Sequence, residues 1–150
     1  MQKRILFVMT AFIVFSLRAF SQKYEIYEKT LRNGLDVIVV QNPAVPLVTV
    51  EFNVKNGAYT ESPEYNGLSH LYEHMFFKAN EAIPNQERYL ERLRELGASW
   101  NGTTSQERVN YFITLGKDSL EQGMKFMYDA ISGPLFKEEE LVKERPVVLG

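Results

Sequence analysis

Residues 67–78 read Gly-Leu-Ser-His-Leu-Tyr-Glu-His-Met-Phe-Phe-Lys, and their pattern constrains the fold more than any other segment. Apolar side chains recur here at spacings of three and four residues, the period of an α-helix with one buried face. The segment therefore predicts an amphipathic helix packed on a core. Its apolar stripe consists of Leu68, Leu71, Tyr72, Met75 and Phe76.

The opposite face of this predicted helix carries His70, Glu73 and His74, which include both histidines of the chain. Imidazoles four residues apart project from successive turns and can bind one ion. Neutral imidazole suits Zn²⁺, and a catalytic zinc takes three protein ligands and a water. The pattern predicts His70 and His74 as metal ligands, with Glu73 beside them as a general base. The alternative is a solvated helix face whose histidine pair binds metal adventitiously.

Composition narrows the possible functions. The chain has 150 residues, which corresponds to about one domain. It contains no cysteine, which excludes a disulfide framework, a thiolate zinc site and a catalytic thiol. The formal net charge of −2 gives no electrostatic footprint for nucleic acid.

The first 21 residues differ from the rest of the chain. Lys3 and Arg4 precede an almost purely apolar run from 5 to 17, and small residues up to Ser21 are typical of a signal-peptide cleavage site. The run is shorter than the roughly 20 residues that span a bilayer. We therefore expect a signal peptide at 1–21 and an exported protein, periplasmic or secreted, with no stable membrane anchor after cleavage. An uncleaved anchor or a buried apolar helix is the alternative.

The rest of the chain mixes strand and helix patterns. Asn33-Gly34 between two apolar runs indicates a hairpin, because both residues tolerate positive φ. The order of elements predicts an α+β fold, with a mixed or antiparallel sheet and helices packed on one face. Strands are predicted at 24–31, 35–40, 48–54, 98–104 and 109–115. Further helices are predicted at 87–96, at 119–131 and from 137 onward. The expected buried stripe of the helix at 119–131 is Leu120, Met124, Met127 and Ile131.

Several segments together resemble one family. They are residues 31–35 (Leu-Arg-Asn-Gly-Leu), 54–58 (Val-Lys-Asn-Gly-Ala) followed by Glu61, 67–78, 96–104, 134–136 and 144–149. Over residues 28–150 the chain is similar to the pitrilysin/insulinase-type metallopeptidases, the inverzincins, whose signature is His-x-x-Glu-His. The resemblance implies the first half-domain of such a peptidase.

Carried onto this sequence, the resemblance implies that His70 and His74 bind one Zn²⁺ and that Glu73 is the catalytic base. The family's third ligand is a glutamate on a later helix, and it is expected at the position directly after Gly150. Glu144 matches an acidic residue that supports the metal site in the family. It lies two helical turns before that position, on the same face.

The resemblance also implies a substrate-binding edge strand. An extended peptide would pair along it by β-augmentation, which reads backbone more than side chains. The alternative for Asn101 and Gly102 is an ordinary kink in a strand. The chain departs from the family pattern at Gly102, where alanine is common, and at Pro146, which removes a backbone donor from a predicted helix. The expected substrate-binding residues are Trp100, Asn101, Gly102 and Thr103.

These expectations combine into one functional hypothesis. Residues 22–150 are expected to be the N-terminal peptidase domain of a zinc-dependent endopeptidase, truncated at its C-terminal end. A peptide is the expected substrate, and a second homologous domain or subunit is expected to close the chamber. The 150-residue chain alone is expected to bind zinc weakly and to cleave little. The alternatives are a non-catalytic subunit or peptide-binding module of the same fold, and a metal-binding domain without hydrolysis.

Overall fold

The computed structural model describes residues 24–149, so the predicted signal peptide at 1–21 lies outside the described residues. The chain divides into two compact units between Val45 and Pro46. In the first unit, strand β1 (Glu25–Thr30) pairs antiparallel with β2 (Asp36–Gln41). The predicted hairpin is confirmed. Of its two turn residues Gly34 alone has a positive φ, of 85°, and Asn33 instead accepts the Leu35 amide through its side chain at 3.2 Å.

The second unit contains a three-stranded antiparallel sheet. Its strands are β3 (Leu47–Val54), β4 (Ser99–Thr104) and β5 (Val109–Gly116), in the order β3-β5-β4. Among the described residues, β5 is therefore central and β4 lies at an edge. The predicted α+β class is confirmed, and the two sheets are separately antiparallel rather than mixed.

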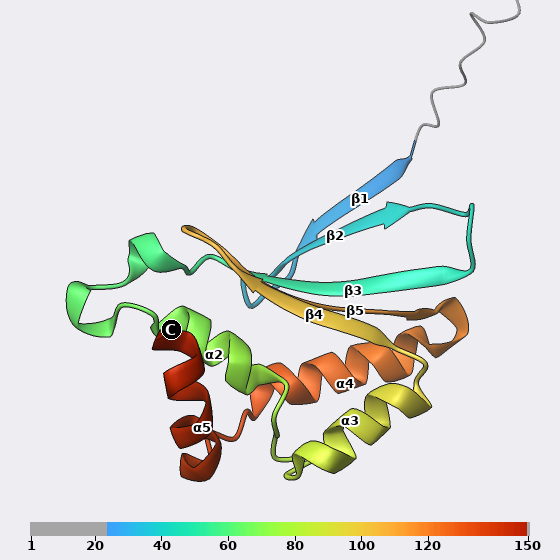
Figure 1. Ribbon diagram of the computed structural model, residues 1–150. Helices are drawn as coiled ribbons and strands as arrows, with labels where there is room; N and C mark the ends of the chain where they lie inside the picture. The colour runs from blue at the N-terminus through green and yellow to red at the C-terminus, as the bar shows by residue number, and fades with distance from the viewer. Residues whose placement is uncertain (1–23, 150) are drawn as a thin grey trace, which may run out of the picture. The chain divides into compact units, whose positions relative to one another are not determined.

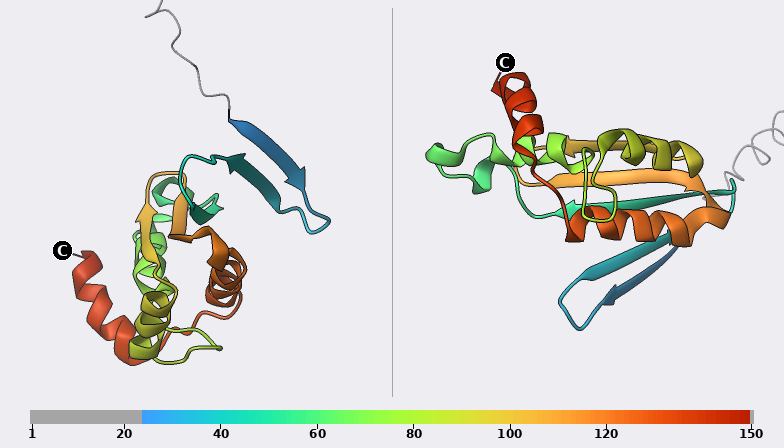
Figure 2. Two further views of the ribbon diagram at one scale, coloured as in Figure 1. Left: turned by 90° about the vertical axis from the view of Figure 1, so that its right-hand side faces the viewer. Right: turned by 90° about the horizontal axis from the view of Figure 1, so that it is seen from below.

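Helices cover one face of this sheet, as predicted (Figures 1 and 2). They are α2 (Leu68–Phe76), α3 (Gln86–Glu95) and α4 (Leu120–Ser132). Helix α5 (Glu138–Leu149) packs on α2. Within residues 24–149, no helix is both long enough and apolar enough to cross a membrane.

The core lies between the sheet and these helices. Tyr111 of β5 stacks on Phe76 of α2, with ring centroids 3.9 Å apart. The predicted stripe of α2 is buried at its C-terminal end, where Met75 and Phe76 are at most 1% exposed, whereas Leu68 in the first turn is 55% exposed. The other fully buried side chains in this layer include Tyr89, Leu93, Ile113, Leu115 and Met127.

Helix α4 corrects one prediction. Of the expected stripe, Met127 is fully buried and Ile131 packs partly buried against the core, but Leu120 and Met124 are exposed. The buried face is rotated toward Gly123, where a Cβ would lie 2.9 Å from Leu115 Cδ2. The missing side chain lets the helix approach β5 closely, and this contact outweighs the burial of the more apolar face. The residues that line the observed face are Gly123, Phe126, Met127 and Ala130.

Replacing Gly123 with valine is expected to destabilise the fold by about 1–3 kcal/mol, the usual cost of overpacking a core. The Cβ would meet the side chains of Leu115 and Ile113. Gly116→Val is the matched control, because its φ of −62° suits any residue and no atom lies within 4 Å of the position that a Cβ would take there. Urea unfolding would measure both free energies. Equal values for the two variants would contradict the close approach of α4.

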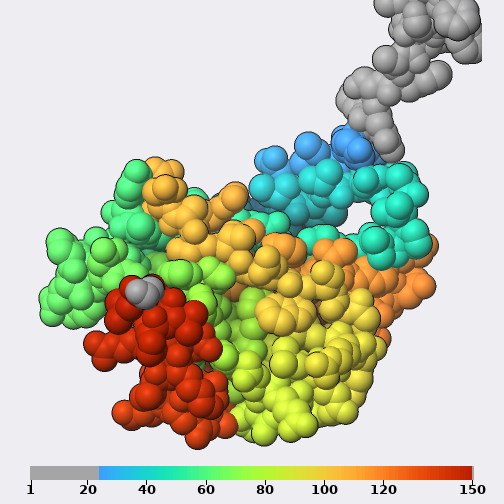
Figure 3. All heavy atoms as spheres, in the orientation of Figure 1, coloured from blue at the N-terminus to red at the C-terminus, as the bar shows by residue number. Residues whose placement is uncertain are grey.

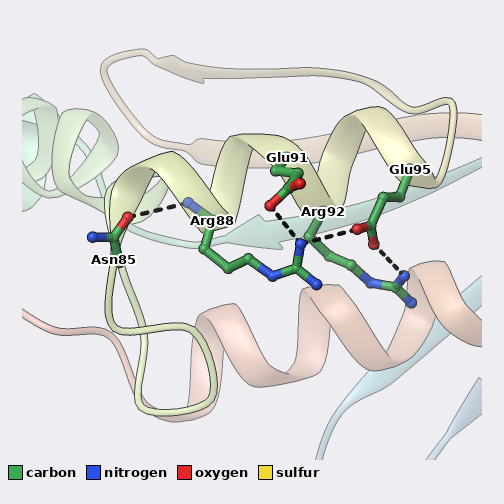
Figure 4. A network of polar contacts seen from close by, with 5 residues as sticks. All are labelled: Asn85, Arg88, Glu91, Arg92 and Glu95. Carbon is green, nitrogen blue, oxygen red and sulfur yellow. Dashed lines mark hydrogen bonds and ion pairs between the residues drawn. The ribbon is translucent and has the colours of Figure 1, made fainter.

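Helix α3 is held at its start by a cap and along its exposed face by ion pairs (Figure 4). The Asn85 side chain accepts the Arg88 amide at 3.1 Å. The Arg88 guanidinium contacts Glu91 at 2.5 Å and Glu95 at 3.0 Å, and Arg92 contacts Glu95 at 2.9 Å. Gly97, which follows the C-cap residue Leu96, has a left-handed φ of 61°. Each end of the observed helix lies within one residue of the predicted range 87–96, between an asparagine cap and a glycine.

Candidate metal centre

The two histidines converge from successive turns of α2. Their Nε2 atoms lie 3.2 Å apart, and their ring centroids lie 4.8 Å apart. A tetrahedral zinc with Zn–N bonds of 2.0–2.1 Å holds two ligand nitrogens about 3.3–3.4 Å apart. The imidazoles of His70 and His74 therefore already have the spacing that one zinc ion requires.

His74 is fixed by a carboxylate on another helix. Its Nδ1 lies 2.8 Å from Glu144 Oε2 of α5. An ionised carboxylate has no proton and can only accept a hydrogen bond. The proton of the neutral His74 ring therefore lies on Nδ1, which donates a hydrogen bond to Glu144. The lone pair of Nε2 is then available for a metal. The sequence singled out Glu144 as a supporting residue, and the structure places it against the second histidine.

Lys78 holds Glu144 in this position. Its Nζ lies 2.6 Å from Glu144 Oε1, and the two side chains are only 16% and 15% exposed. The hydrogen bond from Lys78 lowers the pKa of Glu144 below its ordinary value, against the opposing effect of burial and with a further contribution from His74. Glu144 is therefore ionised at neutral pH. Sequence reasoning missed Lys78, although its position four residues after His74 placed it on the same helix face.

The acidic face of α5 is intact despite Pro146. The helix continues through this residue to Leu149. Glu140, one turn before Glu144, lies 3.6 Å from Lys78 and 2.8 Å from Lys143. The proline therefore does not disturb the way that the last helix presents its carboxylates to α2.

Glu73 points toward the edge strand. Its Oε2 accepts a hydrogen bond from the Thr104 hydroxyl at 2.7 Å. A Cβ at Gly102 would lie 2.9 Å from Glu73 Cγ and 3.2 Å from its Oε1. The glycine at 102 therefore gives the Glu73 side chain the room it occupies. Thr104 is a second residue that sequence reasoning did not single out.

One pocket of about 250 Å³ brings most of these groups together. Trp100 borders it at 38% exposure and packs on Phe77 with ring centroids 4.5 Å apart. Thr103 is not among its lining residues, and its hydroxyl bonds instead to Asn110 of β5. The pocket is lined by Glu73, His74, Phe77, Lys78, Gln86, Trp100, Asn101, Gly102 and Glu144.

The described residues supply two of the donors that a zinc site needs. Within residues 24–149, no cluster of three or more His, Cys, Asp or Glu side chains is arranged to hold a metal ion. The two imidazoles nevertheless fit zinc in donor type and spacing. The expected third ligand would follow Gly150 and so lies beyond these residues.

The chain is similar to known proteins over most of its length. The profile of the family described as Insulinase (Peptidase family M16) matches residues 36–150. Insulin-degrading enzyme-like 2 of Arabidopsis thaliana is 29% identical over 85% of this chain and 13% of its own length. An uncharacterized zinc protease of Rickettsia felis is 31% identical over 79% of this chain and 29% of its own.

A solved structure has a similar fold. The crystal structure of a protease from Helicobacter pylori matches with a TM-score of 0.76 and 26% identity. The match covers 83% of this chain and 30% of that one. The chain therefore spans less than a third of the length of each of these relatives.

Proposed function

Because the chain belongs to the insulinase family of peptidases, family M16, we propose that it forms the zinc-binding part of a metallopeptidase that hydrolyses peptide bonds. The observation that carries the proposal is the pair of Nε2 atoms 3.2 Å apart, with Nδ1 of His74 held by Glu144. Two neutral imidazoles, one of them oriented by a carboxylate, are a usual arrangement for zinc in enzymes.

His70 and His74 are the proposed ligands, and a glutamate directly after Gly150 is the proposed third. Glu144 lies two turns earlier on α5, so a helix continuing past Leu149 would place that glutamate on the face that already meets α2. Zinc in this position would supply a Lewis acid, which acidifies water and polarises a peptide carbonyl.

Glu73 is the proposed general base. Thr104 holds its Oε2, while Oε1 lies beside Gly102 at the pocket. In this arrangement Oε1 is free to take a proton from the attacking water. Glu73 would then return the proton to the leaving amine, so the same carboxyl group acts first as base and then as acid.

The proposed substrate is an extended peptide that pairs with β4. This strand is at the edge of its sheet among the described residues and borders the pocket through Trp100, Asn101 and Gly102. The Gly102 amide donates to the Asn101 side chain at 3.0 Å. A substrate strand that bonded to this amide would replace the Asn101 contact. Thr103, which bonds to β5, is proposed to support the strand rather than to touch the peptide.

Metal removal tests the proposal. In the complete peptidase, a chelator is expected to abolish hydrolysis of an unstructured peptide, and one equivalent of zinc is expected to restore it. The 150-residue chain, with two ligands, is expected to bind zinc weakly in a calorimetric titration. Nanomolar affinity in that chain would show that a further group completes the site. Zinc binding without hydrolysis in the complete peptidase would favour the non-catalytic subunit.

A further inference from the structure

Helix α2 has no cap of its own at the end that carries the first histidine. Its N-cap residue is Gly67, which has a φ of 92° and no side chain to accept a hydrogen bond. The first amides of a helix lack partners within the helix. In α2 a residue from the preceding loop supplies them: Glu61 accepts the Gly67 amide on Oε2 at 2.7 Å and the Ser69 amide on Oε1 at 2.6 Å.

Glu61 is suited to this position by its charge. Burial of the carboxyl group opposes ionisation, but hydrogen bonds from Ser69 and Gly67 hold its pKa below the ordinary value. It is therefore ionised at neutral pH. A negative charge at the N-terminus of a helix also interacts favourably with the helix dipole.

The loop that carries Glu61 is anchored to the other side of the site. The Ala58 amide donates to the Ser105 carbonyl at 3.2 Å, and the Tyr59 amide donates to the Gln106 carbonyl at 2.8 Å. Both carbonyls belong to the turn that directly follows β4. The short helix η1 (Ala58–Thr60) thus connects the end of the edge strand to the start of α2.

The two histidines are held in different ways. His74 is fixed through its own ring, because Nδ1 bonds to Glu144. His70 is exposed, and the hydrogen bonds of the described residues give its ring one partner, His74. The position of the His70 ring therefore depends on its backbone, which lies in the first turn of α2, where helices fray most readily.

We infer that Glu61 is a positioning residue for the metal site: by capping the first turn of α2 from the loop, it fixes His70 where its Nε2 meets that of His74. The role in metal binding rests on the proposed function, whereas the cap itself does not. Glu61 contacts neither imidazole and acts through the backbone of residues 67–69. In the space-filling view, the surface of the segment from η1 to η2 (Pro63–Tyr65) borders that of α5 (Figure 3). A Cβ at Gly67 would lie 4.0 Å from Val148 Cγ1 of α5.

Three variants of the intact protein test this inference. Glu61→Ala removes both acceptors, and Glu61→Gln keeps one acceptor oxygen and loses the charge. Glu64→Ala is the matched control, because it removes the same side chain from the same loop at an exposed position. Hydrogen–deuterium exchange of residues 67–70 reports the cap, and a zinc titration reports the position of His70.

Glu61→Ala is expected to speed exchange of residues 67–70 by about tenfold and to raise the zinc dissociation constant by a similar factor, with Glu61→Gln between it and the parent protein. Exchange in β5 is expected to stay unchanged in all three variants. The zinc affinity of Glu64→Ala is expected to equal that of the parent protein. Unaltered exchange at 67–70 in Glu61→Ala would overturn the cap. Faster exchange with unaltered zinc affinity would overturn the positioning role. If the parent protein binds no zinc, the proposed function and the positioning role both fail, and the exchange data still decide the cap.

Discussion

Glu73→Gln is expected to reduce peptide hydrolysis by the complete peptidase by about 10²–10⁴-fold while zinc stays bound, the range by which a positioned general base accelerates a reaction. Glutamine has the size of glutamate and can still accept the Thr104 hydroxyl that now lies 2.7 Å from Oε2. It cannot take a proton from water at neutral pH. The loss should therefore appear in kcat, and the zinc content measured by elemental analysis should be that of the parent protein.

Glu107→Gln is the control for this substitution. Glu107 is exposed in the turn between β4 and β5, so the same chemical change there leaves the site intact. Its kcat and KM are expected to match those of the parent protein. Hydrolysis that survives in Glu73→Gln with zinc bound would remove Glu73 from the role of base, and the neighbouring Glu144 would then need to be tested in the same way.

The bounds of α2 could be predicted from the sequence to within two residues, because apolar side chains recur there with a clear helical period. The expected helix at 67–78 and the observed one at Leu68–Phe76 differ by one or two residues at each end. Periodicity also placed His70 and His74 opposite the buried Met75 and Phe76. The hairpin and the strand at 98–104 were predictable for the same reason, since strand patterns and turn residues are local signals. The edge position of that strand came from the resemblance to a family and not from its own pattern.

Helix α4 shows that periodicity alone does not determine which face of a helix is buried. Its most apolar stripe included Leu120 and Met124, yet the helix buries Gly123 instead. Which face is buried depends on how closely the helix can approach Leu115 and Ile113 of β5, and the period of one helix carries no information about its neighbour. A glycine within an amphipathic helix was the available signal for such a close approach.

The candidate metal centre could be predicted in part for a similar reason. His70, Glu73 and His74 lie within one helix, so their spacing singled them out as candidates. The groups that hold them come from distant parts of the chain: Glu144 from α5, Thr104 from β4 and Glu61 from a loop. Resemblance to a family pointed to Glu144. No local pattern pairs Thr104 with Glu73, because that contact depends on how the edge strand packs against α2.

The second large effect is expected at His74, whose replacement by alanine should weaken zinc binding by more than about 100-fold. Loss of a residue that only orients a ligand typically costs 10–100-fold in metal affinity, so loss of the ligand itself should exceed that range. Calorimetric titration of the complete peptidase with zinc would measure the change. Affinity within tenfold of the parent value would show that the imidazole of His74 does not bind the metal.

A double-mutant cycle then tests through which of the two histidines Glu144 affects zinc binding. Glu144→Gln should weaken zinc binding by about 10–100-fold, because the Nδ1 of His74 loses an ionised acceptor. In a protein that already carries His74→Ala, the same change should have little further effect, since the group that Glu144 orients is gone. In a protein that carries His70→Ala, Glu144→Gln should keep its full effect, because His70 does not contact Glu144. Equal coupling of Glu144 to both histidines would mean that the carboxylate acts on the metal directly and not through His74.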